Sequence, residues 1–163
     1  MEHFAKESLR IAILTEKRSF DFYRCAAQLV KDERTRKVFE LLAGEESEHM
    51  GAFLAHYPGG EFGDLLSLMS QPPDTNYQTY RSLLAEIGTC TREQQALELS
   101  LREEQACIEH YAILTACLRE PALSVIFEQA LSDTRRHYEL INDEYMRIMG
   151  MVDHSDQDIY VRE

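Results

Sequence analysis

Apolar residues recur at steps of three and four along four long stretches of the chain, which is the spacing of one face of an α-helix. The first stretch shows the pattern at Leu9, Ala12, Ile13, Phe20, Tyr23, Ala27 and Val30. All four stretches are rich in Leu, Ala, Glu, Arg and Gln, which are good helix formers. The pattern predicts four helices, near residues 4–31, 34–57, 92–118 and 121–149.

The lengths of the connections predict how these helices are arranged. Only a few residues separate the first helix from the second and the third from the fourth, so each pair forms an antiparallel hairpin. About thirty residues, 58–90, join the two hairpins, and short helices are expected there at 65–69 and 80–87. We therefore predict an all-α, ferritin-like four-helix bundle of two antiparallel helix hairpins joined by a long crossover.

The expected domain organisation is simple. Residues 1–150 form the bundle, including the crossover at about 58–90, and residues 151–163 form a polar C-terminal tail.

An internal repeat relates the two predicted hairpins. Adding 88 to a position in the first hairpin maps Glu16 to Glu104, Tyr23 to Tyr111 and His49 to His137. Apolar positions follow the same offset without a gap over about forty residues. The chain is thus expected to contain two copies of one hairpin around a pseudo-twofold axis.

Charge and composition exclude several classes of function. The 163 residues include 17 Lys and Arg against 29 Asp and Glu, a net charge of −12, which argues against nucleic acid or anionic lipid as partners. No apolar run approaches the roughly 20 residues of a membrane helix, and no signal core begins the chain, so we expect a cytoplasmic protein without membrane contact. The four cysteines include no CxxC pair, which excludes zinc ribbons and rubredoxin-type iron sites.

Five polar residues lie on the apolar stripes, where burial of an unpaired charge is costly. They are Glu16, Glu46, His49, Glu104 and His137. No Lys or Arg shares these stripes near the same level, so the set predicts a bound metal. A single Glu-x-x-His pair on a helix usually has no such meaning; the repeat-related combination carries the hypothesis. These ligand types suit iron, manganese and zinc alike.

Two further sets of residues keep alternative roles. Tyr23 and Tyr111 lie two turns from Glu16 and Glu104, where they either hydrogen-bond near the site or only pack in the core. Cys107 lies one turn after Glu104 and is interpreted as a small buried apolar residue in preference to a ligand.

Four stretches of the sequence resemble the rubrerythrin family of ferritin-like proteins. They are 16–23 (EKRSFDFY), 42–49 (LAGEESEH), 104–111 (EQACIEHY) and, more weakly, 127–137 (FEQALSDTRRH). The resemblance implies a di-iron site in which Glu16 and Glu104 are terminal carboxylates and Glu46 bridges. It also implies that His49 and His137 each bind one metal. Family members typically reduce hydrogen peroxide with electrons from a rubredoxin-type centre, so here the donor would be a separate protein.

The sequence departs from the family pattern in the fourth stretch. A second bridging Glu is expected three residues before His137, and Thr134 stands there. Asp133 is one residue away but shorter and rotated on the helix. Cys107 replaces a further carboxylate of the peroxide-reducing members. The site therefore has five of the six expected ligands.

Three functions are compatible with this pattern. The first is a di-iron oxidoreductase that reacts with peroxide or oxygen, and the second is a non-catalytic metal-binding or metal-handling bundle. The third is a structural bundle whose site has decayed.

We also expect a homodimer, because the crossover is unusually apolar for a surface segment. The apolar residues concerned are Phe62, Leu65, Leu66, Leu68 and Met69.

Overall fold

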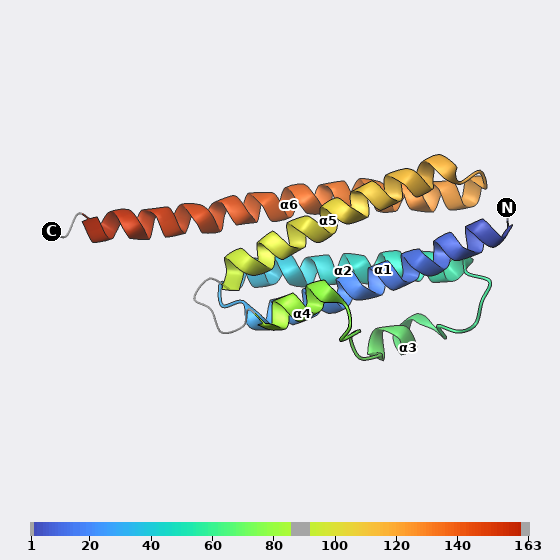
Figure 1. Cartoon of the computed structure of the whole chain (residues 1–163), viewed down its shortest axis with the longest axis horizontal. Coiled ribbons are helices and arrows are strands. Elements are labelled where there is room, and N and C mark those ends of the chain that lie inside the picture. Colours follow the sequence, from blue (N-terminus) through green and yellow to red (C-terminus); the bar gives the residue numbers. More distant parts are fainter. Residues whose placement is uncertain (1, 86–91, 161–163) are drawn as a thin grey trace.

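The computed structural model describes residues 2–85 and 92–160, with side chains for 2–85 and 93–151. The described part contains helices and no strand. The helices are α1 (Glu2–Leu29), α2 (Glu33–His56), α3 (Leu65–Ser70), α4 (Gln78–Ala85), α5 (Arg92–Cys117) and α6 (Pro121–Tyr160). In Figure 1 the four long helices form one elongated bundle, with α3 and α4 on its outside. The predicted all-α bundle of two hairpins and a crossover is confirmed.

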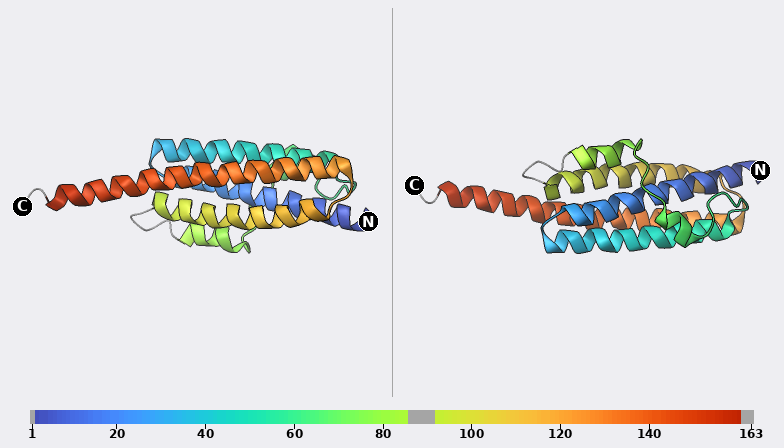
Figure 2. Two further views of the ribbon diagram at one scale, coloured as in Figure 1. Left: turned by 90° about the horizontal axis from the view of Figure 1, so that it is seen from above. Right: turned by 90° about the horizontal axis from the view of Figure 1, so that it is seen from below.

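Packing between helices is concentrated within the two hairpins, α1 with α2 and α5 with α6. Fewer contacts join one hairpin to the other, mainly between α2 and α6 and between α1 and α5. The crossover helices cover different neighbours: α3 lies against α2, and α4 lies against α1 and α5 (Figure 2). The polar residues of the predicted site thus lie where two separately packed hairpins meet.

A polar cluster closes one end of the bundle. Asp32 is the N-cap of α2 and accepts a hydrogen bond from the Thr35 amide at 2.9 Å. Arg147 of α6 donates to the same Asp32 carboxylate, and the Thr35 hydroxyl donates to buried Glu144 at 2.7 Å. The connection between α1 and α2 is therefore tied to α6, which fixes how the two hairpins align.

The crossover is attached to α1 by a buried ion pair. Lys17 pairs with Asp21 one turn later and donates to the carbonyl oxygen of Gln71 at 2.9 Å. Lys17 is the residue next to Glu16, yet its charge is used here and not at the predicted metal ligands. Leu68 of the crossover is fully buried, and of the five apolar residues on which the dimer prediction rested only Leu66 is exposed, at 75 %. The homodimer stays a prediction, and fewer exposed apolar residues support it than the sequence suggested.

The last helix is longer than the periodicity predicted. We expected it to end near residue 149, but α6 runs for 40 residues to Tyr160. Gly150 lies inside it, because one glycine costs a helix only about 1 kcal/mol relative to alanine and flanking residues can outweigh that. In Figure 1 this end of α6 projects beyond the other helices.

Several smaller expectations are also settled. The short helices predicted at 65–69 and 80–87 appear as α3 and α4, although residues 86 and 87 lie outside the described residues. Three cysteines are unpaired, Cys25, Cys107 and Cys117, and Cys90 lies outside the described residues. Within the described ranges, no helix is both long enough and apolar enough to cross a bilayer.

Candidate metal centre

The five predicted side chains meet in the middle of the bundle, and each long helix contributes at least one. Glu16 comes from α1, Glu46 and His49 from α2, Glu104 from α5 and His137 from α6. They form two groups that share Glu46: one with Glu16 and His49, the other with Glu104 and His137. Within each group the potential ligand atoms lie within 4.8 Å of one another. The shared residue makes the two groups neighbours, as two adjacent cations require.

Helix geometry explains why these polar side chains are buried. Glu16 lies between Ile13 and Phe20 on the inward stripe of α1, and His137 lies between Ala130 and Ile141 on that of α6. The three glutamates and His137 are at most 4 % exposed, and the His49 side chain is 10 % exposed. Residues at these positions are carried into the core by the apolar neighbours of the same face.

The Glu46 carboxylate faces both histidines. Its Oε1 lies 3.0 Å from Nδ1 of His137, and its Oε2 lies 3.8 Å from Nδ1 of His49. Nδ1 of His49 is also 3.5 Å from Glu16 Oε2, and Nδ1 of His137 is 3.8 Å from Glu104 Oε1. One oxygen of Glu46 therefore belongs to each group, which is the arrangement of a bridging carboxylate.

Three of these inward atoms lack a partner in hydrogen-bond geometry, although carboxylate oxygens lie 3.0 to 3.8 Å from the two imidazole nitrogens. They are Oε2 of Glu16 and Nδ1 of His49 and His137, all fully buried. A buried polar atom without a partner costs about 1–3 kcal/mol, so native proteins rarely leave three of them together. All three are donors of electron pairs to a cation, and the residues present thus fit a bound metal.

The outer nitrogen of each histidine contacts a carboxylate of the opposite hairpin. Nε2 of His49 lies 2.8 Å from Oδ2 of Asp133 in α6, and Nε2 of His137 lies 2.7 Å from Oε2 of Glu45 in α2. Such carboxylate–histidine pairs orient the ring and raise its basicity toward a metal on the other side. Arg136 in turn donates to Glu45 at 2.9 Å.

The sequence interpretation missed this outer pair. It considered Asp133 only as a substitute for the missing bridging Glu and gave Glu45 no role. The offset of 88 relates Glu45 to Asp133, since 45 + 88 = 133, and this was the available signal. Asp133 contacts the outer side of His49 and is not a member of either inward group.

The two tyrosines hydrogen-bond across the bundle to the buried carboxylates of Glu16 and Glu104. The Tyr111 hydroxyl of α5 donates to Glu16 Oε1 of α1, and the Tyr23 hydroxyl of α1 donates to Glu104 Oε1 of α5. This settles the alternative in favour of hydrogen bonding near the site. Each of these two carboxylates therefore accepts a hydrogen bond from the hairpin that does not carry it.

Thr134 does not replace the bridging carboxylate that the family pattern expects. Its side chain is buried, and its hydroxyl donates at 2.7 Å to the carbonyl oxygen of Ala130, one turn earlier in α6. Cys107 is half-buried and belongs to neither group of potential ligands among the described residues. Burial and the nearby Glu104 carboxylate raise the pKa of the Cys107 thiol, which favours an inert, protonated sulfur.

Without a cation, protons balance the buried carboxylates. Burial and the Glu46 charge raise the pKa of Glu16 well above its ordinary value. Burial alone would lower the histidine pKa values, but Glu16 and Glu46 raise that of His49 to about 12. Glu104 and Glu46 raise the pKa of His137 to about 10. Metal binding needs neutral histidine and ionised carboxylate, so a bound metal takes the place of these protons.

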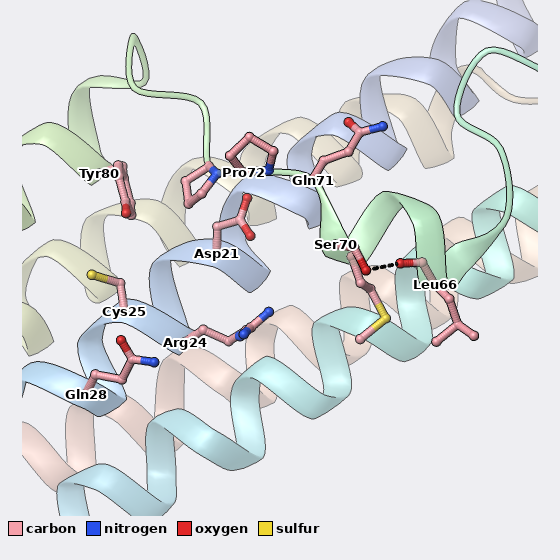
Figure 3. Close-up of a pocket in the computed structure, with 11 residues that line it drawn as sticks. Asp21, Arg24, Cys25, Gln28, Leu66, Ser70, Gln71, Pro72 and Tyr80 are labelled. Carbon is pink, nitrogen blue, oxygen red and sulfur yellow. Dashed lines mark hydrogen bonds between the residues drawn. The ribbon is translucent and has the colours of Figure 1, made fainter.

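A cavity lies outside the bundle centre, between α1 and the crossover. It has a volume of about 510 Å³, and Figure 3 shows Asp21, Cys25 and Tyr80 around it. The Asp21 carboxylate is already paired with Lys17, and the lining contains no member of the two ligand groups. The candidate metal centre is therefore confined to the interior of the four long helices.

Comparison with known proteins adds a family to this geometry. The model of the rubrerythrin family matches residues 7–145, a range that includes all of α2 and α5, most of α1 and α6, and all five inward residues. Searches of curated proteins and of solved structures found no match. The match covers far more than half of the chain and coincides with the two-hairpin bundle that carries the site. The chain belongs to the rubrerythrin family.

Proposed function

We propose that the chain binds two iron ions in the bundle centre and reduces hydrogen peroxide or dioxygen there. The observation that carries this proposal is the pair of ligand groups joined by Glu46. Glu16 and His49 would hold one ion, Glu104 and His137 the other, and Glu46 both. The family match supports iron over zinc and manganese, which the same ligand types also accept.

A ferrous pair in this position would supply two electrons, which with two protons convert hydrogen peroxide into two water molecules. The residues around the pair would hold the charges and exclude water. Tyr23 and Tyr111 orient the terminal carboxylates, and Asp133 and Glu45 orient the histidines. The electrons that restore the ferrous state would come from an iron centre outside these 163 residues, which contain no CxxC pair.

A second candidate function is metal binding without turnover. Thr134 favours it, because the expected second bridging carboxylate is replaced by a hydroxyl that donates to its own helix. Anaerobic titration with ferrous iron, followed by hydrogen peroxide, separates the two functions. Two ions per chain and rapid oxidation support the oxidoreductase. One ion, or zinc retained through redox cycling, supports the binding protein.

The site assignment is tested by removing the shared carboxylate. Glu46→Ala should cause the largest loss of bound metal of any single ligand substitution, because both groups lose a member. Glu48→Ala is the matched control, since Glu48 is exposed on the same helix two residues away. Metal content is measured by elemental analysis after purification without added metal and again after anaerobic loading. Wild-type content in Glu46→Ala would refute the assignment.

A further inference from the structure

A small pocket lies between α2 and α6 beside the candidate metal centre. We propose that it is the entry and binding site for a small uncharged apolar molecule, dioxygen, on its way to the metals. The destination rests on the proposed function, whereas the binding site itself does not depend on it. The pocket has a volume of about 240 Å³ and is separate from the cavity next to α1.

The walls of the pocket are mainly apolar. Ala52 and Phe53 line it from α2, and Val125, Ile126 and Ala130 line it from α6. The two polar residues of the lining are His49 and Gln129, and the side-chain amide of Gln129 donates to Asp133 at 3.0 Å. No charged side chain of Asp, Glu, Lys or Arg belongs to the lining. The pocket therefore offers dispersion contacts and almost no hydrogen bonds to a molecule inside it.

His49 connects the pocket with the ligand groups, because it belongs to both. Its Nδ1 faces Glu16 and Glu46, and its Nε2 is held by Asp133. A molecule in the pocket thus lies against the side chain of His49, which is also a member of one ligand group.

Two further contacts place the pocket next to the inner part of the site. Phe53 packs against Phe127 with ring centroids 4.9 Å apart and lies near Tyr111, which donates to Glu16. The carbonyl oxygen of Ala130 accepts a hydrogen bond from the hydroxyl of Thr134, and 134 is the position where the family pattern expects a carboxylate. A Glu at 134 would carry charge to this side of the site, whereas threonine keeps it uncharged.

Size and charge select the class of ligand. An apolar cavity of about 150 Å³ is enough to bind benzene or xenon, so a pocket of about 240 Å³ accepts a diatomic gas easily. It is too small for a helix or an extended peptide. Anions are disfavoured by the net charge of −12, and polar molecules lose hydrogen bonds with water on entering. Hydrogen peroxide is such a polar molecule, so this route discriminates in favour of dioxygen.

Xenon tests the binding site on the metal-free protein. We expect xenon to bind at saturation to one site per chain, detected by xenon NMR and by an anomalous peak in crystals pressurised with the gas. Ala52→Leu should abolish this signal, because the added side chain fills the pocket from an exposed helix position. Ala55→Leu, an exposed alanine on the same helix that does not line the pocket, should retain it. Absence of xenon from the wild-type pocket would overturn the proposal.

Oxidation of the ferrous-loaded protein tests the route. In this reaction two ferrous ions each lose one electron, and dioxygen gains two electrons and two protons to give hydrogen peroxide. Ala52→Leu should slow oxidation by dioxygen while leaving oxidation by added peroxide unchanged, and Ala55→Leu should change neither. Equal rates for wild type and Ala52→Leu with dioxygen would overturn the route. A chain that binds xenon but no iron would refute the proposed function and leave the binding site intact.

Discussion

Each histidine of the centre uses its two ring nitrogens for different purposes. An ionised carboxylate can accept a hydrogen bond but cannot donate one. The Nε2 atoms that contact Asp133 and Glu45 must therefore carry the proton of each neutral imidazole. The lone pair is then at Nδ1, which faces the inward carboxylates of both groups. The outer carboxylates thereby select the tautomer that a metal needs.

Removal of the outer charges should weaken metal binding while all five inward residues remain. Asp133→Asn should lower affinity at the His49 group, and Glu45→Gln at the His137 group, each by about 10–100-fold. Competition with a chelator measures both affinities, and Glu48→Gln serves as the control because Glu48 is exposed and lies outside both groups. Unchanged affinity in both variants would show that the outer contacts do not position the histidines.

Thr134→Glu should complete the ligand pattern. Thr134 is buried one turn before His137 on the same face, and 134 = 46 + 88, so the new carboxylate would match Glu46 in the repeat. Without metal this adds a buried charge beside three carboxylates and should lower thermal stability. With ferrous iron the cations offset that cost, so the gain in melting temperature on loading should exceed that of wild type.

The control for this variant is Thr134→Gln, because glutamine has nearly the same size as glutamate and cannot carry its negative charge. Iron stoichiometry and melting temperature are measured for both variants with and without metal. A Thr134→Glu protein that binds no more iron than wild type would refute the idea that the missing bridge limits the site.

At the scale of elements, one carboxylate attaches the crossover to α5. The hydroxyls of Tyr77 and Thr79 both donate to Glu103, which is half-buried beside Glu104. Burial and the neighbouring Glu104 charge raise the pKa of Glu103 to about 7. The contact that fastens the start of α4 therefore titrates near neutral pH.

The sign of this pH dependence follows from the raised pKa. The folded protein prefers protonated Glu103, so its contribution to stability is complete below pH 4.5 and is lost as pH rises through about 7. Glu103→Gln keeps an acceptor without the charge. It should raise the melting temperature at pH 8 and change it little at pH 4.5, and Glu109→Gln, at an exposed position of α5, is the control variant. Equal shifts at both pH values would contradict the assignment.

Periodicity predicted the elements well because apolar spacing and short connections determine which helices pair. The Glu16–Glu104 and His49–His137 repeat also indicated which side chains face inward. The contacts between hairpins were not predictable in the same way. The apolar face of a helix shows which side chains point into the core. The packing of the two hairpins decides which residue of the other hairpin each one contacts, as the Tyr23–Glu104 and Tyr111–Glu16 hydrogen bonds illustrate. The end of α6 was missed because a single Gly150 resembles a stop signal.

At the scale of the whole molecule, the pseudo-twofold relation organises the centre. The helices pack mainly within their own hairpins, while both tyrosine bonds and both outer histidine contacts join one hairpin to the other. Figure 2 shows the two hairpins side by side along their length. The polar interior is therefore an interface between two similar halves as much as it is a site.

Such crossed contacts have a consequence for how the chain matures. Neither hairpin alone contains a complete, oriented set of ligands, because the residues that orient Glu16 and His49 are Tyr111 and Asp133 of the other half. A newly made chain with only its first hairpin formed would compete poorly for metal in the cell. Strong metal capture would then begin only when the second hairpin docks, and the bound ions would hold the finished assembly closed.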